Sequence, residues 1–435
     1  MAGEVEVWGD SQEEIKRNKY FKSANLELSK SEDGKYFKND GELRDDDNKM
    51  YTEGQFNHLI QNEVMSFVDN TYDNIVLLAG AGASVVTDEN GDINPNFGKT
   101  MSMIAENIAI ELGDICNLAG QDLLDKLVGS SQYFKLQELA DLIKYEVKVT
   151  KLIDNGKTSF NWEFNLEDFL SNLITYEQFL SDDKEKFIRT KNKILDLIKE
   201  NTNYSFDIEN MNHAKILKIL SQKVKKPNKL SIITTNYDTL FEEAAEMIGF
   251  TVLDGFTFSY NPYFDSDIFE WNFVKDIPNV KTNELEYKKN VVNLLKIHGS
   301  LTWEKAKKGN RIRRKIKTNV DVPIMVFPSS NKYMQSYEEP YFELFTKFQE
   351  LLKRPNTLLI TTGFSFADNH IAKMVTQAIK SNAGLAVLIS DYNIDQAHPN
   401  WEELDVLKST HYRIAFLKAT LNDNLTNYLG ENYVD

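Results

Sequence analysis

Short, mostly apolar runs recur along the chain. They lie at 75–78, 230–234, 291–297, 323–327, 358–362, 385–390 and 412–417. Because a strand that is apolar at nearly every position is buried on both faces, such runs are typical of central parallel strands. Apart from the hinge between the third and fourth runs, segments of helix length separate them. This alternation predicts an α/β fold: a doubly wound, Rossmann-like, mostly parallel sheet of about six or seven strands.

Between the first two runs, the apolar positions change to helical spacing. They recur at i, i+3 and i+4 over 101–112, 136–152, 166–180, 185–200 and 211–224, without a convincing strand. A crossover of this length predicts a large helical domain inserted into the sheet domain. We therefore expect a polar N-terminal segment (1–70) that is irregular or partly helical, an inserted helical domain (101–225), and a sheet domain made of 71–100 and 226–435.

Composition adds that the protein is folded and soluble. Its 435 residues are 41% hydrophobic and carry a formal net charge of −16, which excludes disordered and fibrous classes and argues against a protein that coats nucleic acid with its whole surface. Cys116 is the sole cysteine, so an intrachain disulfide and a cysteine-cluster zinc site are excluded. Since no signal-type or membrane-spanning run is present, we expect a cytoplasmic protein without membrane contact.

Candidate chemistry is expected where strands end, because open α/β sheets bind ligands at the carboxyl ends of their strands. The first run leads into GAGAS, which comprises Gly80, Ala81, Gly82, Ala83 and Ser84. Such a turn can direct amide N–H groups at an anion such as a pyrophosphate. The full G-x-G-x-x-G fingerprint fails and no Walker sequence is present. On this motif alone, a tight turn without a ligand is an equal alternative.

Polar residues also follow the second and third runs. The second run ends in TTNYD (234–238), where Thr235, Asn236 and Asp238 crowd the strand terminus. Helix capping would explain Asn236 or Asp238, but not the whole cluster. The third run ends in KIHGS (296–300), which places His298 where a general base could act, although a lone histidine is more often structural.

Two later runs end in similar polar residues. After 358–362 comes GFS, in which Gly363 and Ser365 can offer an amide and a hydroxyl to a phosphate or ribose. Asp368 and Asn369 are interpreted as caps of the helix that follows. After 385–390, Asp391 can hold a ribose or an adenine amine. Together these signals are what one nucleotide site would need.

The four motifs, in this order, resemble the sirtuin superfamily. Its members carry a GAG-[SA] turn, a T-x-N-x-D motif, a histidine before glycine and a G-[TFY]-S turn, and the match extends over roughly residues 72–395. The resemblance implies an NAD site that needs no metal. The residues it implies for NAD binding are Gly80, Ala81, Gly82, Ser84, Thr235, Gly363, Ser365 and Asp391.

The resemblance also implies three catalytic roles. Asn236 would contact the ribose near the reacting carbon and position the attacking group, Asp238 would bind the nicotinamide carboxamide, and His298 would be the general base. Phe256, Phe258 and Tyr260 are expected to form an aromatic lid, although plain packing is the commoner use of such a cluster.

The chain departs from the sirtuin pattern in two respects, and these departures indicate which branch of the superfamily it resembles. Sirtuin deacylases carry two cysteine pairs on a zinc module, which this chain lacks, and 85–98 reads VVTDENGDINPNFG in place of G-I-P-x-F-R. In these respects, and in the phrases NLEDFL, TTNYDTLFEEA, HGSLTW and GFSFADNHI, the chain resembles sirtuin-like NADases of bacterial antiphage defence, including those paired with a HerA-type ATPase.

One segment contrasts with the acidic whole. Lys305–Lys317 holds eight basic residues in thirteen and reads as a β-hairpin arm around Gly309-Asn310. It is either a solvated hairpin or a contact, with nucleic acid or, as we favour, with an acidic neighbouring subunit of a homo-oligomer.

The function expected from the resemblance is hydrolysis of NAD to nicotinamide and ADP-ribose by an antiphage effector. Two alternatives stay open at this point. One is an NAD-dependent protein deacylase, which the missing zinc module disfavours. The other is a nucleotide-sensing or DNA-associated scaffold that binds without turnover.

Overall fold

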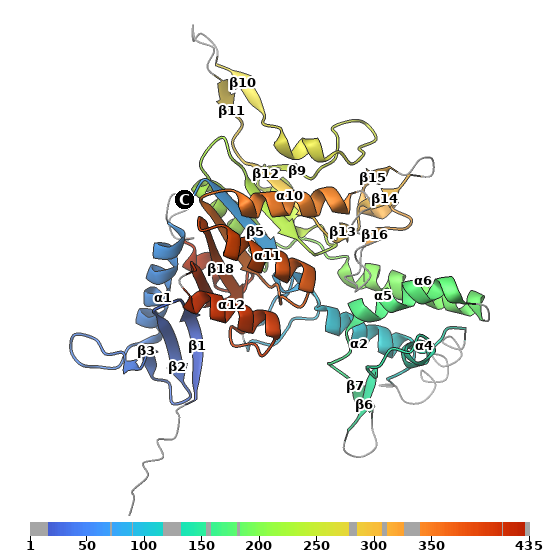
Figure 1. The fold of residues 1–435 in the computed structure, drawn as a ribbon, viewed down its shortest axis with the longest axis horizontal. Helices are drawn as coiled ribbons and strands as arrows, with labels where there is room; N and C mark the ends of the chain where they lie inside the picture. The colour runs from blue at the N-terminus through green and yellow to red at the C-terminus, as the bar shows by residue number, and fades with distance from the viewer. Residues whose placement is uncertain are drawn as a thin grey trace, which may run out of the picture.

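The computed structural model describes residues 16–69, 72–88, 90–115, 132–153, 158–180, 183–277, 285–306, 311–325, 340–410 and 412–430. Cys116 and the centre of the basic hairpin at 307–310 lie outside these residues. Most described strands join one large sheet, which Figure 1 shows at the centre of the molecule. The strands of this sheet are β1 (Arg17–Lys22), β2 (Glu27–Ser31), β3 (Tyr36–Lys38), β4 (Gly41–Glu42), β5 (Asn74–Ala79), β8 (Leu230–Thr234), β9 (Thr251–Leu253), β12 (Val291–Lys296), β17 (Thr357–Thr362), β18 (Leu385–Asp391) and β19 (Ile414–Lys418).

The strand order confirms the doubly wound α/β fold. The sheet runs β4-β3-β2-β1-β19-β18-β17-β5-β8-β12-β9, and all pairs from β19 to β9 are parallel. From β5 the chain moves outward to β8, continues to β9 at the edge of the sheet and comes back to β12 between them. It then crosses to the other side of β5 with β17, β18 and β19. The switch point therefore lies between β5 and β17, where the loops that follow these strands can hold a ligand.

Helices cover both faces of this sheet (Figure 1). Alternate residues of each central strand enter opposite cores, because side chains point to opposite faces along a strand. Leu77 and Ile232 pack in one core with α1, α7, α8 and α13, whereas Val76 and Ile233 pack in the other with α10, α11 and α12. The helix bounds are α1 (Glu53–Val68), α7 (His213–Lys223), α8 (Leu240–Met247), α10 (Tyr341–Lys353), α11 (Asn369–Ser381), α12 (Pro399–Ser409) and α13 (Leu425–Tyr428).

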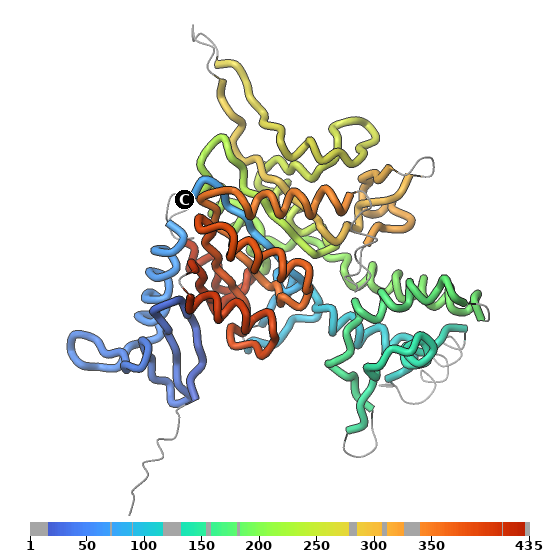
Figure 2. Tube along the Cα trace, in the orientation of Figure 1, coloured from blue at the N-terminus to red at the C-terminus, as the bar shows by residue number. Residues whose placement is uncertain are grey.

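A helical body separate from the sheet follows β5, as the crossover length predicts. Figure 2 shows it projecting to the right of the sheet. Its helices are α2 (Met101–Glu111), α4 (Leu136–Leu142), α5 (Leu166–Tyr176) and α6 (Lys184–Thr202). They share an apolar core with Tyr237 and Leu301 of the sheet domain. The next helix, α7, packs on the sheet although it falls within the expected range 101–225. The helical body thus ends before α7.

The N-terminal segment differs from the irregular structure expected for 1–70. Its described part forms the antiparallel strands β1 to β4 and then α1, and β1 pairs with β19 at the edge of the main sheet. The strands are short and mostly polar, and a few buried residues such as Phe21, Leu28 and Phe37 anchor them. So sparse an apolar pattern does not stand out in the sequence.

Two further expectations are wrong. The segment 136–152 is not one helix: α4 ends at Leu142, and β6 (Thr150–Leu152) pairs with β7 (Thr158–Phe160) in a hairpin. Lys144 has φ 57°, a left-handed conformation that a helix cannot continue through. In the described part of 323–327, β16 (Ile324–Met325) is only half-buried and pairs with β13 (Gly299–Ser300) outside the main sheet.

The small elements are as follows. The remaining two-stranded sheets pair β10 (Val274–Asp276) with β11 (Leu285–Tyr287) and β14 (Trp303–Lys305) with β15 (Ile312–Arg314). Single turns of 3₁₀ helix are η1 (Ala81–Ala83), η2 (Glu177–Phe179), η3 (Ser266–Glu270) and η4 (Lys317–Asn319).

Candidate nucleotide site at the strand ends

The turn after β5 and the turn after β17 contact each other through backbone atoms. The Gly80 N–H donates to Thr362 O at 3.0 Å, and the Gly82 N–H donates to Gly363 O at 3.0 Å. A Cβ at Gly80 would lie 2.5 Å from Gly363 O, and one at Gly82 would lie 2.8 Å from Gly363 Cα. Gly363 itself has φ 58°. The three glycines are therefore required by a close approach of two backbones, which the sequence did not predict.

This packing uses amides that were expected to face a phosphate. Besides those of Gly80 and Gly82, the Ala83 N–H donates to Gly80 O at 2.9 Å and the Ser84 N–H donates to Ala81 O at 3.1 Å. The turn thus satisfies these donors internally. Phosphate binding by Ala81, Gly82 and Ser84 stays a prediction.

Ser84 joins the first motif to the second. Its Oγ donates to Asp238 Oδ2 at 2.7 Å and accepts from Asn236 Nδ2 at 2.9 Å, and Asn236 Nδ2 also donates to Gly80 O at 3.0 Å. Ser84 and Asp238 are buried. Because the carboxylate and amide are hydrogen-bonded to one hydroxyl, their orientations are fixed relative to each other. The structure therefore brings three predicted site residues into one network.

Capping explains only part of this cluster. The second oxygen of Asp238, Oδ1, accepts from the Leu240 N–H at the start of α8 at 3.2 Å. Tyr237 between the two polar residues points away into the core of the helical body and is buried. Asn236 makes no cap contact, and its side chain is used for the network with Ser84.

His298 lies on the neighbouring strand end. Lys296 pairs with Thr234 in the β12–β8 ladder, so His298 follows β12 next to the TTNYD turn. The ring is buried, and Nε2 lies 3.2 Å from Asp368 Oδ2. A carboxylate at this distance can orient an imidazole and stabilise its protonated form. Asp368 is therefore placed as a charge partner of His298.

Asp368 is a candidate functional residue that the sequence did not reveal. Its Oδ1 accepts from the His370 and Ile371 N–H groups, at 2.9 and 3.4 Å, so it caps α11 as predicted. Its other oxygen faces His298. The cap pattern hides the second contact, since the partner lies far away in the sequence.

Lys296 also contacts the TTNYD turn. It is the last residue of β12, is 2% exposed, and its Nζ lies 3.2 Å from Glu242 Oε1 and donates to the Asp238 carbonyl. Burial raises the pKa of Glu242, an effect that the charge of Lys296 opposes. A lysine that ends an apolar strand was a signal for this contact, because a buried charge needs a partner.

A pocket opens beside the Ser84 network. One wall consists of Ala81, Ser84, Thr235, Asn236, Tyr237 and Asp238. The other wall comes from the helical body and its flanks: Lys99, Met101, Ile104, Glu167, Thr202 and Tyr204. Here the Lys99 N–H donates to Tyr204 Oη at 2.9 Å, and Lys99 Nζ donates to Asn201 Oδ1 at 2.7 Å. The helical body therefore closes the side of the pocket opposite Asn236 and Asp238, whereas His298 is not among the lining residues.

Two predicted nucleotide contacts lie further along the sheet edge. Ser365 is exposed, and Asp391 ends β18, one strand beyond β17. Asp391 Oδ1 accepts from the Asn393 N–H at 3.1 Å and Gln396 Nε2 at 3.0 Å. Burial raises the pKa of Asp391 to about 6, against these hydrogen bonds. Both residues share the carboxyl edge with the network, but neither lines the pocket at Ser84.

The expected aromatic lid is not formed. Phe256 is a core residue that packs edge-on to Phe264 and against Trp303, whereas Phe258 and Tyr260 are 60% and 98% exposed. The basic segment does form the predicted hairpin, with Trp303 opposite Arg314 and Lys305 opposite Ile312. Several of its cations are paired within the chain: Arg314 with Asp254, Lys315 with Glu304, and Lys317 with Glu243.

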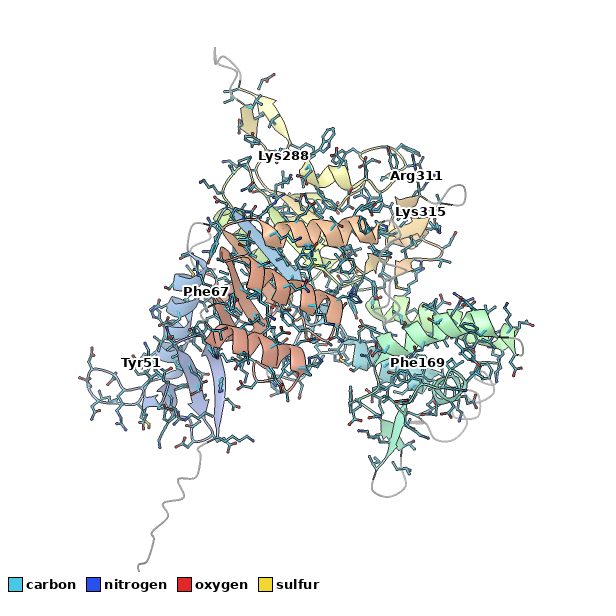
Figure 3. All side chains as sticks on the ribbon, in the orientation of Figure 1. Tyr51, Phe67, Phe169, Lys288, Arg311 and Lys315 are labelled. Carbon is cyan, nitrogen blue, oxygen red and sulfur yellow. The ribbon has the colours of Figure 1, made fainter. Side chains whose placement is uncertain are left out.

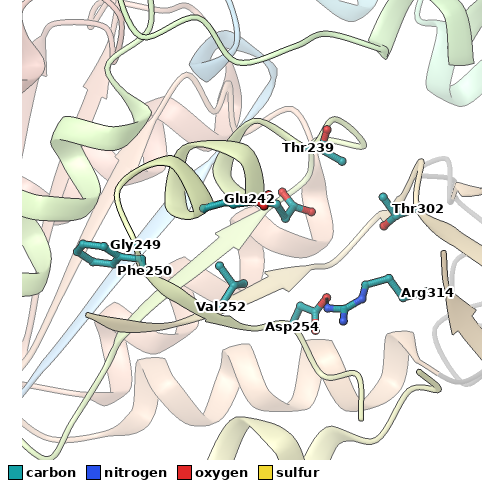
Figure 4. Close-up of a pocket in the computed structure, with 9 residues that line it drawn as sticks. Thr239, Glu242, Gly249, Phe250, Val252, Asp254, Thr302 and Arg314 are labelled. Atoms are coloured by element: carbon teal, nitrogen blue, oxygen red, sulfur yellow. Dashed lines mark hydrogen bonds and ion pairs between the residues drawn. The ribbon is translucent and has the colours of Figure 1, made fainter. Parts of the chain in front are cut away.

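A second pocket lies between α8, β9 and β15 (Figure 4). It is lined by Glu242, Glu246, Asp254 and Arg314 together with Phe250 and Val252. Arg314 Nη1 lies 2.5 Å from Asp254 Oδ2. This pocket shares Glu242 with the Lys296 pair but contains none of the predicted site residues.

The described residues contain no group of three or more His, Cys, Asp or Glu side chains that could hold a metal ion. Within the same part of the chain, no helix is both long and apolar enough to cross a membrane.

Comparisons with known proteins identify a family domain around the later strand-end motifs. The family model of the SIR2-like domain matches residues 230–411, a range that includes TTNYD, KIHGS, GFS and Asp391 and begins after GAGAS. One similar solved structure is titled "Structural Basis for the Mechanism and Regulation of Sir2 Enzymes". It aligns with a TM-score of 0.36 and 11% identity, over 86% of this chain and 96% of that chain. None of the curated proteins matches the chain. Residues 230–411 are therefore similar to the SIR2-like domain.

Proposed function

We propose that this protein is an NAD hydrolase, which cleaves the nicotinamide–ribose bond of NAD to give nicotinamide and ADP-ribose. The observation that carries the proposal is the gathering of polar motifs at the carboxyl ends of neighbouring strands. Asn236 and Asp238 share Ser84, and His298, which follows β12, lies 3.2 Å from Asp368, which follows β17. Hydrolysis needs few groups beyond these, because the bond breaks through an oxocarbenium-like transition state.

Each group has a definable part in the reaction. Asp238 holds the carboxamide of the leaving nicotinamide, and Asn236 positions a water beneath C1′ of the ribose. As the C1′–N bond breaks, its electron pair stays on the nicotinamide nitrogen, which becomes neutral. The water oxygen bonds to C1′, and one water proton passes to His298. Asp368 stabilises the imidazolium formed in this step.

The helical body favours hydrolysis over deacylation. It forms the outer wall of the pocket, with Lys99, Glu167 and Tyr204 opposite Asn236 and Asp238. An acyl-lysine substrate would have to enter where these side chains lie. A water molecule needs no such opening.

The experiment is to incubate the purified protein with NAD and to follow free nicotinamide. We expect release without any peptide. His298→Ala and Asn236→Ala should each lower it by at least about 100-fold, and His58→Ala, which alters an exposed histidine on α1, should leave it unchanged. Full activity in both site variants would overturn the assignment.

The alternatives give different results in the same assay. Release only in the presence of an acylated peptide would identify a deacylase. NAD binding with no release, even after addition of a HerA-type ATPase, would identify a scaffold. A role in antiphage defence and an ATPase partner follow from the resemblance alone, and the homo-oligomer follows from the basic segment Lys305–Lys317 in an acidic chain. Native mass measurement with and without the ATPase tests the assembly.

A further inference from the structure

A third pocket lies at the opposite edge of the sheet from the nucleotide site. It opens where β8 and β12 begin, and Leu230, Val291, Phe273 and Tyr287 are among its lining residues. The motif residues follow the other ends of the same two strands. The length of these two strands therefore separates this pocket from Asn236 and His298.

Basic and amide side chains dominate the lining. Lys226, Lys229, Lys288 and Lys289 surround the pocket together with Asn228, Asn272 and Asn290, and no acidic residue lines it. Figure 3 shows Lys288 at the base of the β10–β11 hairpin. In a chain with a net charge of −16, a pocket with four cations and no carboxylate is a strong local reversal of charge. Such a reversal attracts anions.

Lys229 is fixed at the wall of this pocket. Its Nζ donates to Trp271 O at 2.5 Å and to Asn272 Oδ1 at 3.3 Å, and both acceptors are neutral. No described carboxylate forms an ion pair with any of the four pocket lysines. Burial lowers the pKa of Lys229 to about 8, and the charges of Lys347 and Arg354 act in the same direction. The cation is thus held in place without a counter-charge.

The size of the pocket limits the anion. The cavity has a volume of about 50 Å³, which is room for a few waters. A tetrahedral oxyanion fits this space. Lysines suit such an anion because each ammonium acts as a compact point charge with rotatable donors.

We propose that this pocket is a phosphate-binding site that is separate from the nucleotide site. Lys229 contacts the phosphate from the wall, Lys226, Lys288 and Lys289 neutralise its charge, and the asparagine amides donate to its oxygens. The phosphate is either the free anion or the terminal group of a small phosphate monoester. Bound there, it joins the loops that precede β8 and β12.

The test is calorimetric titration with inorganic phosphate at constant ionic strength, balanced with sodium chloride. Wild-type protein should bind one phosphate saturably. Lys229→Met and the double variant Lys288→Gln/Lys289→Gln should each weaken binding at least tenfold. Lys275→Gln is the matched control, because Lys275 lies on the same hairpin but is paired with Glu286 outside the pocket. Asn236→Ala should bind phosphate as the wild type does.

Two outcomes would overturn the proposal: the absence of saturable binding, or equal affinity in wild type and in the double variant, whose lysines are exposed and whose fold is not at risk. Competition with glycerol 3-phosphate shows whether the pocket takes the free anion or the end of a phosphate monoester. Displacement of phosphate at similar concentration indicates a monoester end, and failure to displace it indicates the free anion. Loss of binding in Asn236→Ala alone would place the phosphate in the nucleotide site instead.

Discussion

At the scale of single residues, the candidate site depends on side chains that serve two partners at once. Ser84 donates to Asp238 and accepts from Asn236. Asp238 also accepts from the first turn of α8, and Asp368 both caps α11 and contacts His298. A sequence pattern reveals the local partner of each residue, because a cap lies two or three positions away. The distant partner depends on the fold.

Substitutions of Asp368 can separate its role as the cap of α11 from its contact with His298. Asn and Ser cap helices about as well as Asp, but neither supplies a charge to His298. We therefore expect Asp368→Asn and Asp368→Ser to keep the urea midpoint of the wild type. Nicotinamide release should fall about 10- to 100-fold in kcat, with KM for NAD unchanged, because base catalysis is worth roughly this much.

Asn369→Ala is the matched control beside the cap, since Asn369 is exposed and its side-chain contact is to Asn400. It should leave kcat unchanged. If Asp368→Asn retained full kcat, the contact with His298 would have no part in the reaction, and Asp368 would be a cap alone.

At the scale of elements, the central strands were predictable and the peripheral ones were not. The run 230–234 is β8 itself, and 358–362 lacks only the first residue of β17, because both strands are buried on both faces. The β6–β7 hairpin was missed, since Leu152 is 80% exposed and the hairpin buries little apolar surface. Short strands at an edge carry too few buried positions to show a period.

The glycine contact between the turns after β5 and β17 leads to a second prediction. Gly363 has a positive φ, and a Cβ there would meet Gly82 and Ala83 backbone atoms. Gly363→Ala should therefore push the GAGAS and GFS turns apart. We expect the free energy of unfolding to fall by about 2 kcal/mol or more. Thermal unfolding followed by circular dichroism would measure this loss.

Gly54→Ala provides the opposite case in α1. A Cβ at Gly54 would meet no atom within 4 Å, and the φ of this residue is not positive, so alanine should stabilise the helix by about 0.5–1 kcal/mol. If both variants changed the midpoint equally, the close approach at Gly363 would not constrain the fold.

At the scale of the whole molecule, buried titratable groups make stability depend on pH. His213, at the start of α7, is 1% exposed, and its ring packs edge-on against Phe241. Burial lowers its pKa to about 4, although the charge of Asp238 acts in the opposite direction. The unfolded chain takes up a proton near pH 6.5, so stability is full above that pH and falls as the pH drops towards 4.

Between pH 7 and pH 5, this linkage should cost about 2 kcal/mol of unfolding free energy. His213→Leu removes the titrating imidazole and replaces it with an apolar side chain of similar size. Urea unfolding at the two pH values should show a smaller loss for the variant than for the wild type. Asp391, whose pKa is raised, has the opposite dependence below pH 6 and is present in both proteins. Equal losses would exclude His213 as a cause.

The position of β5 in the sheet also determines when the sheet can assemble during synthesis on the ribosome. This strand ends at Ala79, but the strands on its two sides begin at Leu230 and Thr357. On the ribosome, β5 is synthesised long before either neighbour exists, and the helical body emerges in the interval with most of its apolar core. The ends of β5 and β17 meet only after Gly363 has left the exit tunnel. The candidate nucleotide site is thus among the last features to form, and an incomplete chain carries no assembled site.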